Sequence, residues 1–128
     1  MKKNLIVILL IFLIPAIAFA MLSKNEAPVV QVNNSQMPEM IKFTSSMCMD
    51  CQTMNKIIKD VFPAFEDKIV LTEIHVENKN SFNDGKIKEY NVTLVPTIVL
   101  LNSDGTQVQR IEGAISQDEM TKYLESLR

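Results

Sequence analysis

Apolar and polar positions divide the chain into three stretches of different character. Residues 5–20 are almost all apolar, whereas residues 23–37 are polar except for a valine-rich patch at residues 29–32. We interpret residues 21–37 as a linker that leads into a short edge strand, because polar residues and a proline dominate there. From residue 38 to residue 128, apolar positions recur at every second residue or at steps of three and four, which predicts a folded domain of strands and helices.

The first half of this domain predicts a strand, a helix and a second strand. Residues 40–44 are a short run typical of a strand. From Cys48 onward, apolar residues return at steps of three and four until Pro63 interrupts them, which predicts a helix with one buried face. That face comprises Cys51, Met54, Ile57, Ile58 and Val61. Residues 68–76 are rich in branched side chains and predict a central strand.

A short helix and a hairpin are expected next. The helix is expected at residues 86–90, with Asn91 closing it in the left-handed conformation. Residues 97–101 and 107–111 predict two strands of an antiparallel hairpin, because Asn-Ser-Asp-Gly at residues 102–105 is a strong turn signal.

The domain closes with a predicted helix after Gly113. Ser116 and Glu119 have the spacing of a capping box, in which each side chain bonds the backbone amide of the other residue. The buried face of this helix is expected to hold Met120, Tyr123, Leu124 and Leu127. The order strand, helix, strand, helix, strand, strand, helix predicts an α/β fold with a central mixed sheet covered by helices.

The apolar start of the chain predicts export. Lys2 and Lys3 precede the apolar run, which ends at residues 18–20 in Ala-Phe-Ala, a pattern that signal peptidase accepts. We therefore interpret residues 1–20 as a cleaved signal peptide or, since 18 apolar residues reach Leu22, as an N-terminal membrane anchor. In either case the lysines stay in the cytoplasm, and the domain is expected in the periplasm or another extracytoplasmic space, free or tethered to the inner membrane.

Charge argues against a nucleic-acid partner. The leader holds two of the 13 basic residues and none of the 15 acidic ones, so 11 basic and 15 acidic residues remain and the net charge is minus four. Binding to nucleic acid would call for a basic face. A domain of about this size can bury a modest core without a covalent staple, so the two cysteines need not be structural.

The cysteine pair carries the candidate chemistry. Cys48 and Cys51 are three residues apart, and a disulfide that closes so small a loop constrains the unfolded chain little. The partial positive charge at a helix start stabilises a thiolate, so we expect Cys48 to be the nucleophile. Cys51, one turn further on the apolar face, is expected to be the resolving thiol.

Three further segments resemble the thioredoxin superfamily. Besides Cys-Met-Asp-Cys at residues 48–51, Val95-Pro96-Thr97 is similar to that family's cis-proline segment, and residues 102–105 and 110–114 are similar to its closing hairpin. The resemblance covers residues 38–127. It implies a three-layer fold in which Pro96 packs against the cysteines and the backbone of Val95 pairs with a substrate chain. It also implies no cofactor beyond the Cys48–Cys51 disulfide, and protein thiols or disulfides as partners.

Four positions depart from that pattern. Met47 stands where thioredoxins commonly have tryptophan, Met49-Asp50 replaces their usual Gly-Pro, and Lys42 occupies the place of a buried acid that assists proton transfer. We interpret Lys42 as a residue that snorkels its charge to the surface. Met47 and Met49 flank the thiols and are interpreted as an apolar docking surface for substrates.

Asp50 suggests a direction for the exchange. A carboxylate beside the thiols opposes thiolate formation, and a less stable thiolate shifts the equilibrium toward the disulfide. We therefore expect a reductant-leaning protein with a potential nearer thioredoxin's roughly −270 mV than a strong oxidant's roughly −120 mV.

Two other functions remain open on the residues alone. Thiolate and thioether are soft ligands suited to Cu(I), so the cysteines could belong to a copper-binding or copper-delivery module, with five methionines near them in sequence. These are Met37, Met40, Met47, Met49 and Met54. Methionine also fills cores, so we expect Met40 and Met54 to pack there and not to bind metal. The second alternative is a non-catalytic adaptor that binds partner chains along the Val95 edge.

Other polar residues are given ordinary roles. A structural zinc site is not expected, because four ligands are wanted and the chain has two cysteines and one histidine. That histidine, His75, is interpreted as structural or exposed. The sequon at Asn91 is interpreted as accidental. We expect a monomer whose partners are client proteins and a membrane or periplasmic redox protein.

Overall fold

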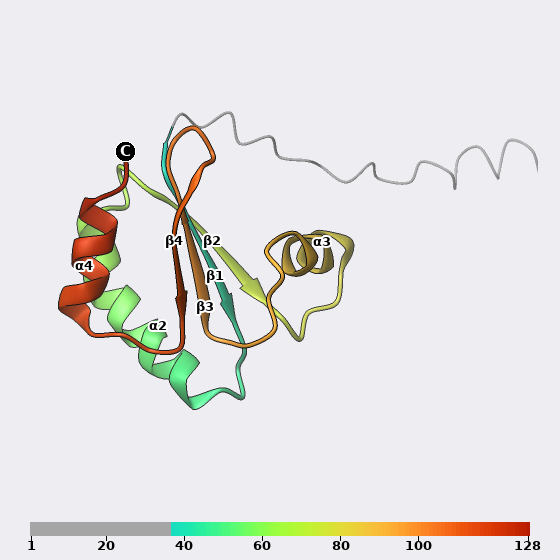
Figure 1. Ribbon diagram of the computed structural model, residues 1–128. Helices are drawn as coiled ribbons and strands as arrows, with labels where there is room; N and C mark the ends of the chain where they lie inside the picture. Colours follow the sequence, from blue (N-terminus) through green and yellow to red (C-terminus); the bar gives the residue numbers. More distant parts are fainter. Residues whose placement is uncertain (1–36) are drawn as a thin grey trace, which may run out of the picture. The chain divides into compact units, whose positions relative to one another are not determined.

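The computed structural model describes residues 37–128, which form a four-stranded mixed sheet with helices on both faces (Figure 1). The strands are β1 (Glu39–Thr44), β2 (Val70–His75), β3 (Thr97–Leu101) and β4 (Gln107–Glu112). Their order is β2-β1-β3-β4; β1 is parallel to β2 and antiparallel to β3, and β3 is antiparallel to β4. The predicted α/β fold with a mixed central sheet flanked by helices is confirmed.

The helices divide between the two faces. Helices α2 (Met49–Val61) and α4 (Gln117–Glu125) cover one face, and α3 (Ser81–Glu89) covers the other (Figure 1). The larger core cluster joins α2 and α4 to the sheet through Met40, Met54, Ile58, Val61, Ile69, Ile98, Leu100, Ile111, Met120 and Leu124. The smaller cluster lies under α3 and contains Ile41, Phe43, Ile74, Val99 and Leu101.

Strand β1 carries the core on both sides. Five of its six residues are buried, and successive side chains of a strand point to opposite faces. Met40 packs in the α2 and α4 cluster, whereas Ile41 and Phe43 pack under α3. Lys42 and Thr44 therefore share the α2 side of the strand with Met40. This alternation places two polar side chains beneath the helix that carries the cysteines.

The second predicted strand differs from expectation in its place in the sheet. Within residues 37–128, β2 pairs with β1 alone and lies at a sheet edge, while β1 and β3 are central. Only Ile74 of β2 is fully buried. The branched side chains at residues 68–76 suggested burial on both faces, but Thr72 and Glu73 fit the half-exposed position that the strand takes.

Helix α3 is longer than the predicted residues 86–90. It begins at Ser81 because Asn80 caps it, its Oδ1 accepting the backbone N–H of Asn83 at 2.8 Å. The buried Asn83 side chain donates to the backbone oxygens of His75 and Asn78, which ties the helix start to the end of β2. Asn91 has φ +47°, so its predicted left-handed conformation is confirmed.

The closing hairpin and helix follow the prediction closely. Gly105 has φ +81° in the turn between β3 and β4 and donates its backbone N–H to the oxygen of Asn102 at 2.8 Å. The capping box of Ser116 and Glu119 is present at the start of α4. Of its predicted face, Met120 and Leu124 are buried, whereas Tyr123 and Leu127 are partly buried against the core.

The predicted leader at residues 1–20, and residues 21–36 of the predicted linker and edge strand, lie outside the described residues. Among the helices of residues 37–128, none combines the length and the apolar character that crossing a membrane requires.

Candidate functional site

Cys48 begins helix α2 at the end of the loop that follows β1. Its backbone is extended, with φ −101° and ψ 121°, and its carbonyl accepts the N–H of Gln52 at 3.2 Å to start the helix. The sulfur of Cys48 accepts the backbone N–H of Cys51 at 3.2 Å and so acts as the N-cap. The first cysteine therefore lies where the free N–H groups and the positive end of the helix dipole are.

Cys48 and Cys51 are joined by a disulfide, and their Cα atoms are 5.1 Å apart. The two residues differ in exposure, since Cys48 is half-buried and Cys51 is 0% exposed. Cys51 faces the core from the first turn of α2. One sulfur is thus open to approach from solvent while the other is shielded, which allows a partner thiol to attack one end of the bond only.

The segment before β3 lies against the exposed sulfur. Sγ of Cys48 is 3.5 Å from the carbonyl oxygen of Val95. The Val95–Pro96 peptide bond is cis, and the Pro96 side chain is buried. The Pro96 carbonyl accepts the N–H of Gly113 at 2.9 Å, and Thr97 Oγ1 donates to the carbonyl of Leu94 at 2.8 Å. The structure therefore brings the predicted residues Val95 and Pro96 to the cysteine pair, although Val95 is 47 residues from Cys48 in sequence.

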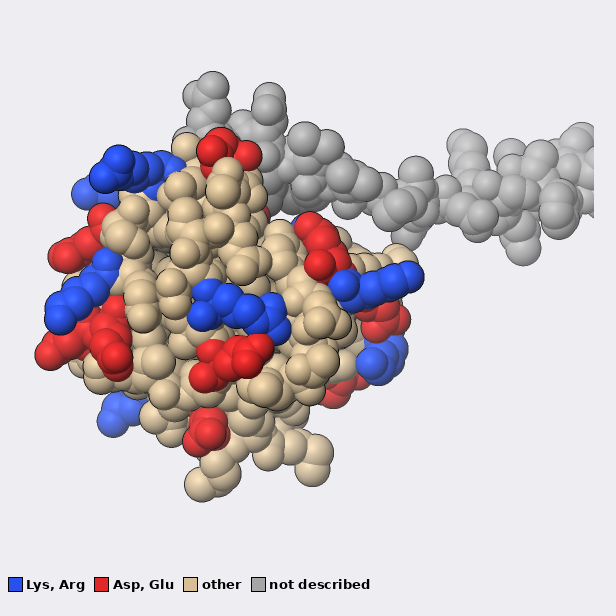
Figure 2. Space-filling model, viewed as in Figure 1, with Lys and Arg blue, Asp and Glu red and all other residues tan. Residues whose placement is uncertain are grey.

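Apolar side chains surround this end of the domain. Met47 is 94% exposed and Met49 is 77% exposed, on either side of Cys48, and Leu94 is 44% exposed in the segment before Val95. The lower end of Figure 2, where α2 begins in Figure 1, carries few charged side chains. Asp50 is exposed in the first turn of α2. The site is thus an apolar, weakly charged surface with one carboxylate beside the disulfide.

Lys42 does not snorkel to the surface, and that prediction was wrong. Its side chain is only 5% exposed, and its ammonium donates to Asn55 Oδ1 at 2.8 Å and lies 2.6 Å from a carboxylate oxygen of Glu73. Asn55 is one helical turn beyond Cys51 on α2. The lysine points inward because β1 is central and buried, and two partners compensate its charge there.

The ion pair continues into a chain of polar groups that sequence reasoning missed. His75 Nε2 lies 2.9 Å from Glu73, and its Nδ1 lies 3.6 Å from Glu77. Glu77 Oε1 in turn accepts the backbone N–H of Ser46 at 2.9 Å, in the loop before Cys48. The signal in the sequence was the alternation of ionisable residues at 73, 75 and 77, which places them on one face of an extended chain.

Two carboxyl groups of this network of polar side chains have lowered pKa values. Partial burial raises the pKa of Glu73, but the hydrogen bond and charge of Lys42, helped by His75, outweigh this and lower it below its ordinary 4.5. The hydrogen bond from the Ser46 backbone, together with the other local hydrogen bonds, lowers the pKa of Glu77 to about 2. Both groups are therefore ionised at neutral pH, where they hold their partners.

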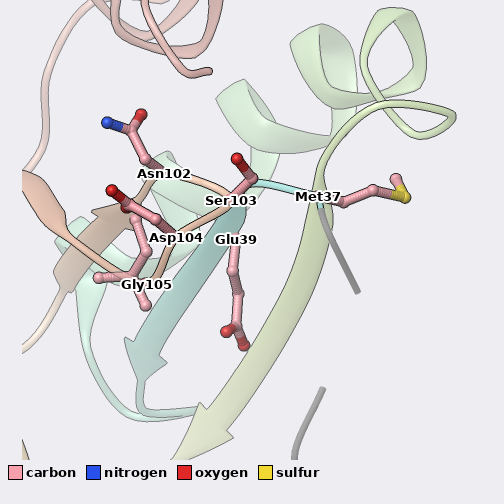
Figure 3. A pocket seen from close by; sticks show the side chains of 7 residues that line it. Met37, Glu39, Asn102, Ser103, Asp104 and Gly105 are labelled. Carbon is pink, nitrogen blue, oxygen red and sulfur yellow. The ribbon is translucent and has the colours of Figure 1, made fainter. Parts of the chain in front are cut away.

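The methionines do not all gather around the thiols. Met40 and Met54 are fully buried in the core, as the packing interpretation expected. Met37 precedes β1 and lines a pocket with Glu39 and the β3–β4 turn, at the opposite end of the strand from Cys48 (Figure 3). Only Met47 and Met49 of the five flank the disulfide. In residues 37–128, no three histidine, cysteine or acidic side chains meet in a way that could hold a metal ion.

Comparisons with known proteins agree with this geometry. A family model for the thioredoxin-like domain matches residues 25–128. The chain is 28% identical over 92 residues to chloroplastic thioredoxin Y1 of Arabidopsis thaliana. The aligned region covers 72% of this chain and 51% of that protein. It is 26% identical over 95 residues to chloroplastic thioredoxin Y of Oryza sativa subsp. japonica, which covers 74% and 54%. The chain spans about half the length of these curated relatives.

A solved structure is similar in fold. The crystal structure of the germline-specific thioredoxin Deadhead from Drosophila melanogaster matches with a TM-score of 0.63 at 20% identity. The match covers 75% of this chain and 86% of that one. At this identity the likeness concerns the fold alone.

Proposed function

Because this chain belongs to the thioredoxin-like domain family, we propose that its Cys48–Cys51 pair carries out dithiol–disulfide exchange with protein substrates outside the cytoplasm. Family membership and the cysteine pair support a thiol-disulfide oxidoreductase in general terms. The observation that carries the fuller proposal is the unequal exposure of two bonded sulfurs at a helix start, beside the Val95 carbonyl.

In the reducing direction, Cys48 is the attacking residue. As a thiolate, stabilised by the N–H of Cys51 and the positive end of α2, it attacks one sulfur of a client disulfide. A bond forms between Cys48 and that sulfur, the client S–S bond breaks, and the other client sulfur leaves as a thiolate with the electron pair. The product is a mixed disulfide between this protein and its client.

Cys51 completes the exchange. Its thiolate attacks the sulfur of Cys48 and the Cys48–Cys51 bond forms. The bond between Cys48 and the client breaks, and that client sulfur leaves as a thiolate with the electron pair. The client disulfide is thereby reduced by two electrons and the cysteine pair is oxidised. No cofactor beyond the two cysteines is needed. Because Cys51 is buried, it is protected from other reagents until the mixed disulfide brings a target within reach.

Val95 and Pro96 are proposed to hold the client chain. The Val95 carbonyl lies beside Cys48, where an extended client segment can pair with backbone groups next to its reacting sulfur. Met47 and Met49 add exposed, adaptable apolar contacts on either side. Recognition by backbone pairing and methionine contacts depends little on the client's side chains, which suits a protein with several clients.

Asp50 supports the proposal that the protein donates electrons. Its exposed carboxylate is one residue from Cys51 and two from Cys48, where it opposes thiolate formation. The helix dipole stabilises the Cys48 thiolate, and the nearby Asp50 carboxylate partly cancels that effect. The potential is therefore proposed to be nearer thioredoxin's roughly −270 mV than a strong oxidant's roughly −120 mV. A measured potential above roughly −180 mV, the value of disulfide isomerases, would reject this direction.

Export rests on the sequence of the first 20 residues. The proposed signal peptide or anchor would bring residues 38–128 to the periplasm or an equivalent space. There the protein is proposed to act as a monomer. A membrane or periplasmic redox protein is proposed to return its cysteine pair to the dithiol form. Cell fractionation of the full chain, with the mature N-terminus determined, checks the location and separates cleavage from anchoring. Recovery of the full-length protein from the cytoplasm would contradict it.

Trapping with Cys51→Ala tests the exchange with clients. This variant can attack through Cys48 but cannot resolve, so client proteins are expected to remain bonded to it and to be released by a reductant. Cys48→Ala is the matched control, which should retain none. Equal retention of clients by the variant without either cysteine would favour the non-catalytic adaptor. Stoichiometric Cu(I) binding that survives a competing chelator and needs Met47 and Met49 would favour the copper module instead.

A further inference from the structure

Thr44 presents a buried hydroxyl with no partner. It ends β1, three residues before Met47, and is 1% exposed. Among buried side-chain nitrogen and oxygen atoms of residues 37–128, only Thr44 Oγ1 lacks a hydrogen-bond partner. Buried hydroxyls are nearly always satisfied, so an exception calls for an explanation such as a role in another state of the protein.

The Thr44 side chain is on the α2 side of the sheet. Side chains alternate along β1, so Thr44 is on the same face as Met40, which packs with α2, and Lys42, which bonds Asn55 of α2. The opposite face is occupied by Ile41 and Phe43 under α3. Thr44 is therefore on the helix side of the sheet, at the end of the strand that leads to the cysteines.

The contact between Lys42 and Asn55 gives an approximate register between strand and helix. Strand β1 and helix α2 run in opposite directions (Figure 1). From Lys42, two residues toward the end of the strand advance about 6.6 Å to Thr44. From Asn55, four residues toward the start of the helix retreat about 6 Å to Cys51. The two steps are nearly equal, which puts Thr44 at about the level of Cys51 along the helix. In the disulfide form the Thr44 hydroxyl makes no hydrogen bond to either sulfur.

Reduction creates a need for a hydrogen-bond donor at this level of the helix. Cys51 is 0% exposed and, in the disulfide, its sulfur is a weak and uncharged acceptor. When Cys51 resolves a mixed disulfide, it must exist as a thiolate in the same buried place, where water does not compensate its charge. We propose that Thr44 Oγ1 donates a hydrogen bond to the Cys51 thiolate and so makes the resolving attack possible beneath the helix.

The inference deepens the proposed function and rests on it. The attack remains the one described above: the Cys51–Cys48 bond forms, the bond from Cys48 to the client breaks, and the client leaves with the electron pair. The hydroxyl keeps its proton throughout and only stabilises the attacking anion. Lys42, two residues earlier on the same face, contributes positive charge that is shared with Glu73.

The test measures the Cys51 thiol itself, in a Cys48→Ala background where it is the only thiol. Its pKa is followed by the NMR shift of isotope-labelled cysteine Cβ, because a buried sulfur is poorly accessible to alkylating reagents. Thr44→Val keeps the shape but removes the hydroxyl, and is expected to raise the pKa of Cys51 by about one unit, a tenfold loss of thiolate near neutral pH. Thr44→Ser keeps the hydroxyl and is expected to stay within about a third of that shift.

Two controls keep the outcome decisive. Thr72→Val removes a hydroxyl that bonds Glu39 on another strand and should leave the pKa of Cys51 unchanged. Thr44→Ala, which lacks the hydroxyl without adding bulk, replaces Thr44→Val if the latter does not fold. With both cysteines present, Thr44→Val should slow release of a thiol client from the mixed disulfide about tenfold while formation of that disulfide by Cys48 stays the same.

An unchanged Cys51 pKa in Thr44→Val and Thr44→Ala would overturn the inference. The single-thiol protein cannot turn over any client, so that result leaves the exchange reaction standing. Conversely, a raised pKa in a protein whose cysteine pair reduces nothing would keep the hydrogen bond and reject the proposed function.

Discussion

The ammonium of Lys42 lies 2.6 Å from the carboxylate of Glu73, and the two residues are in register across the parallel strands β1 and β2. Asn55 of α2 accepts a second hydrogen bond from the same ammonium at 2.8 Å. The three residues connect both strands to the helix one turn beyond Cys51.

Replacing Lys42 with methionine should destabilise the fold. Methionine fills a similar volume, but Asn55 and Glu73 lose their shared donor, and the cost is expected to be about 1–2 kcal/mol because Glu73 is partly hydrated. Chemical unfolding of the oxidised protein measures this loss. Lys56→Met, at an exposed position of α2, is the control and should change the stability little. Equal stability of the two variants would show that the ion pair contributes nothing.

The contribution of this ion pair should depend on pH. The folded pKa of Glu73 is lowered from 4.5, so its stabilising effect is fully present above the unfolded pKa and is lost as pH falls through the folded value. The stability difference between the natural chain and Lys42→Met should therefore be constant above about pH 5.5 and should shrink in more acidic solution. A difference that grows toward low pH would contradict the assignment.

Glu77 should hold the loop before Cys48 across the whole working range of pH. Its folded pKa of about 2 means that the carboxylate accepts the Ser46 N–H at every pH above about 3. Glu77→Ala frees that loop and is expected to lower kcat/KM for insulin reduction roughly three- to tenfold, since misplacing a nucleophile reduces productive encounters. Glu66→Ala removes an exposed carboxylate distant in sequence and serves as control. An unaffected Glu77→Ala enzyme would show that the tether is not needed.

Asp50 should raise the pKa of Cys48. In the reduced protein, Asp50→Asn is expected to lower that pKa by roughly half a unit, as for a solvent-exposed charge within one helical turn, and to shift the potential toward more oxidising values. The pH dependence of Cys48 alkylation gives the pKa, and equilibration with glutathione gives the potential. Asp60→Asn, near the other end of α2, should alter neither quantity. A more reducing Asp50→Asn protein would reverse the proposed direction of the effect.

Met47 and Met49 should matter for protein substrates only. The double replacement Met47→Ala and Met49→Ala removes exposed side chains, so stability should be unchanged while KM for insulin rises roughly three- to tenfold. Reaction with a small aromatic disulfide should proceed as before, because it needs the sulfur and not the surface. Phe82→Ala tests an exposed apolar side chain of α3 in the same assays. A slowed reaction with the small disulfide would place the methionines in the chemistry itself.

Short-range patterns predicted most of the fold. The apolar period from Cys48 to Val61, the turn at residues 102–105 and the capping box at Ser116 each depend on neighbouring residues, and each element formed as expected. Helix α3 was underestimated because its start depends on Asn80 and on the buried Asn83, which bonds the end of β2. Such a contact is visible only after the chain has folded back on itself.

Long-range pairing explains what the sequence did not reveal about the site. Lys42 was expected at the surface because its partner Glu73 is 31 residues away, and nothing local indicates that β1 and β2 are adjacent. The grouping of methionines failed for the same reason, since nearness in sequence placed Met37 beside the cysteines although a whole strand separates them. The cysteine pair itself is a local feature of a helix start and needed no such information.

Insulin reduction with single serine replacements tests the central claim most directly. Cys48→Ser removes the attacking sulfur and Cys51→Ser removes the resolving one, so each variant should lose catalytic turnover by at least about a hundredfold while its fold is retained. Glu66→Ser, at an exposed position distant in sequence from the cysteines, is the control for handling and expression. Turnover by either cysteine variant at the rate of the natural chain would contradict the claim that these two sulfurs carry out the exchange.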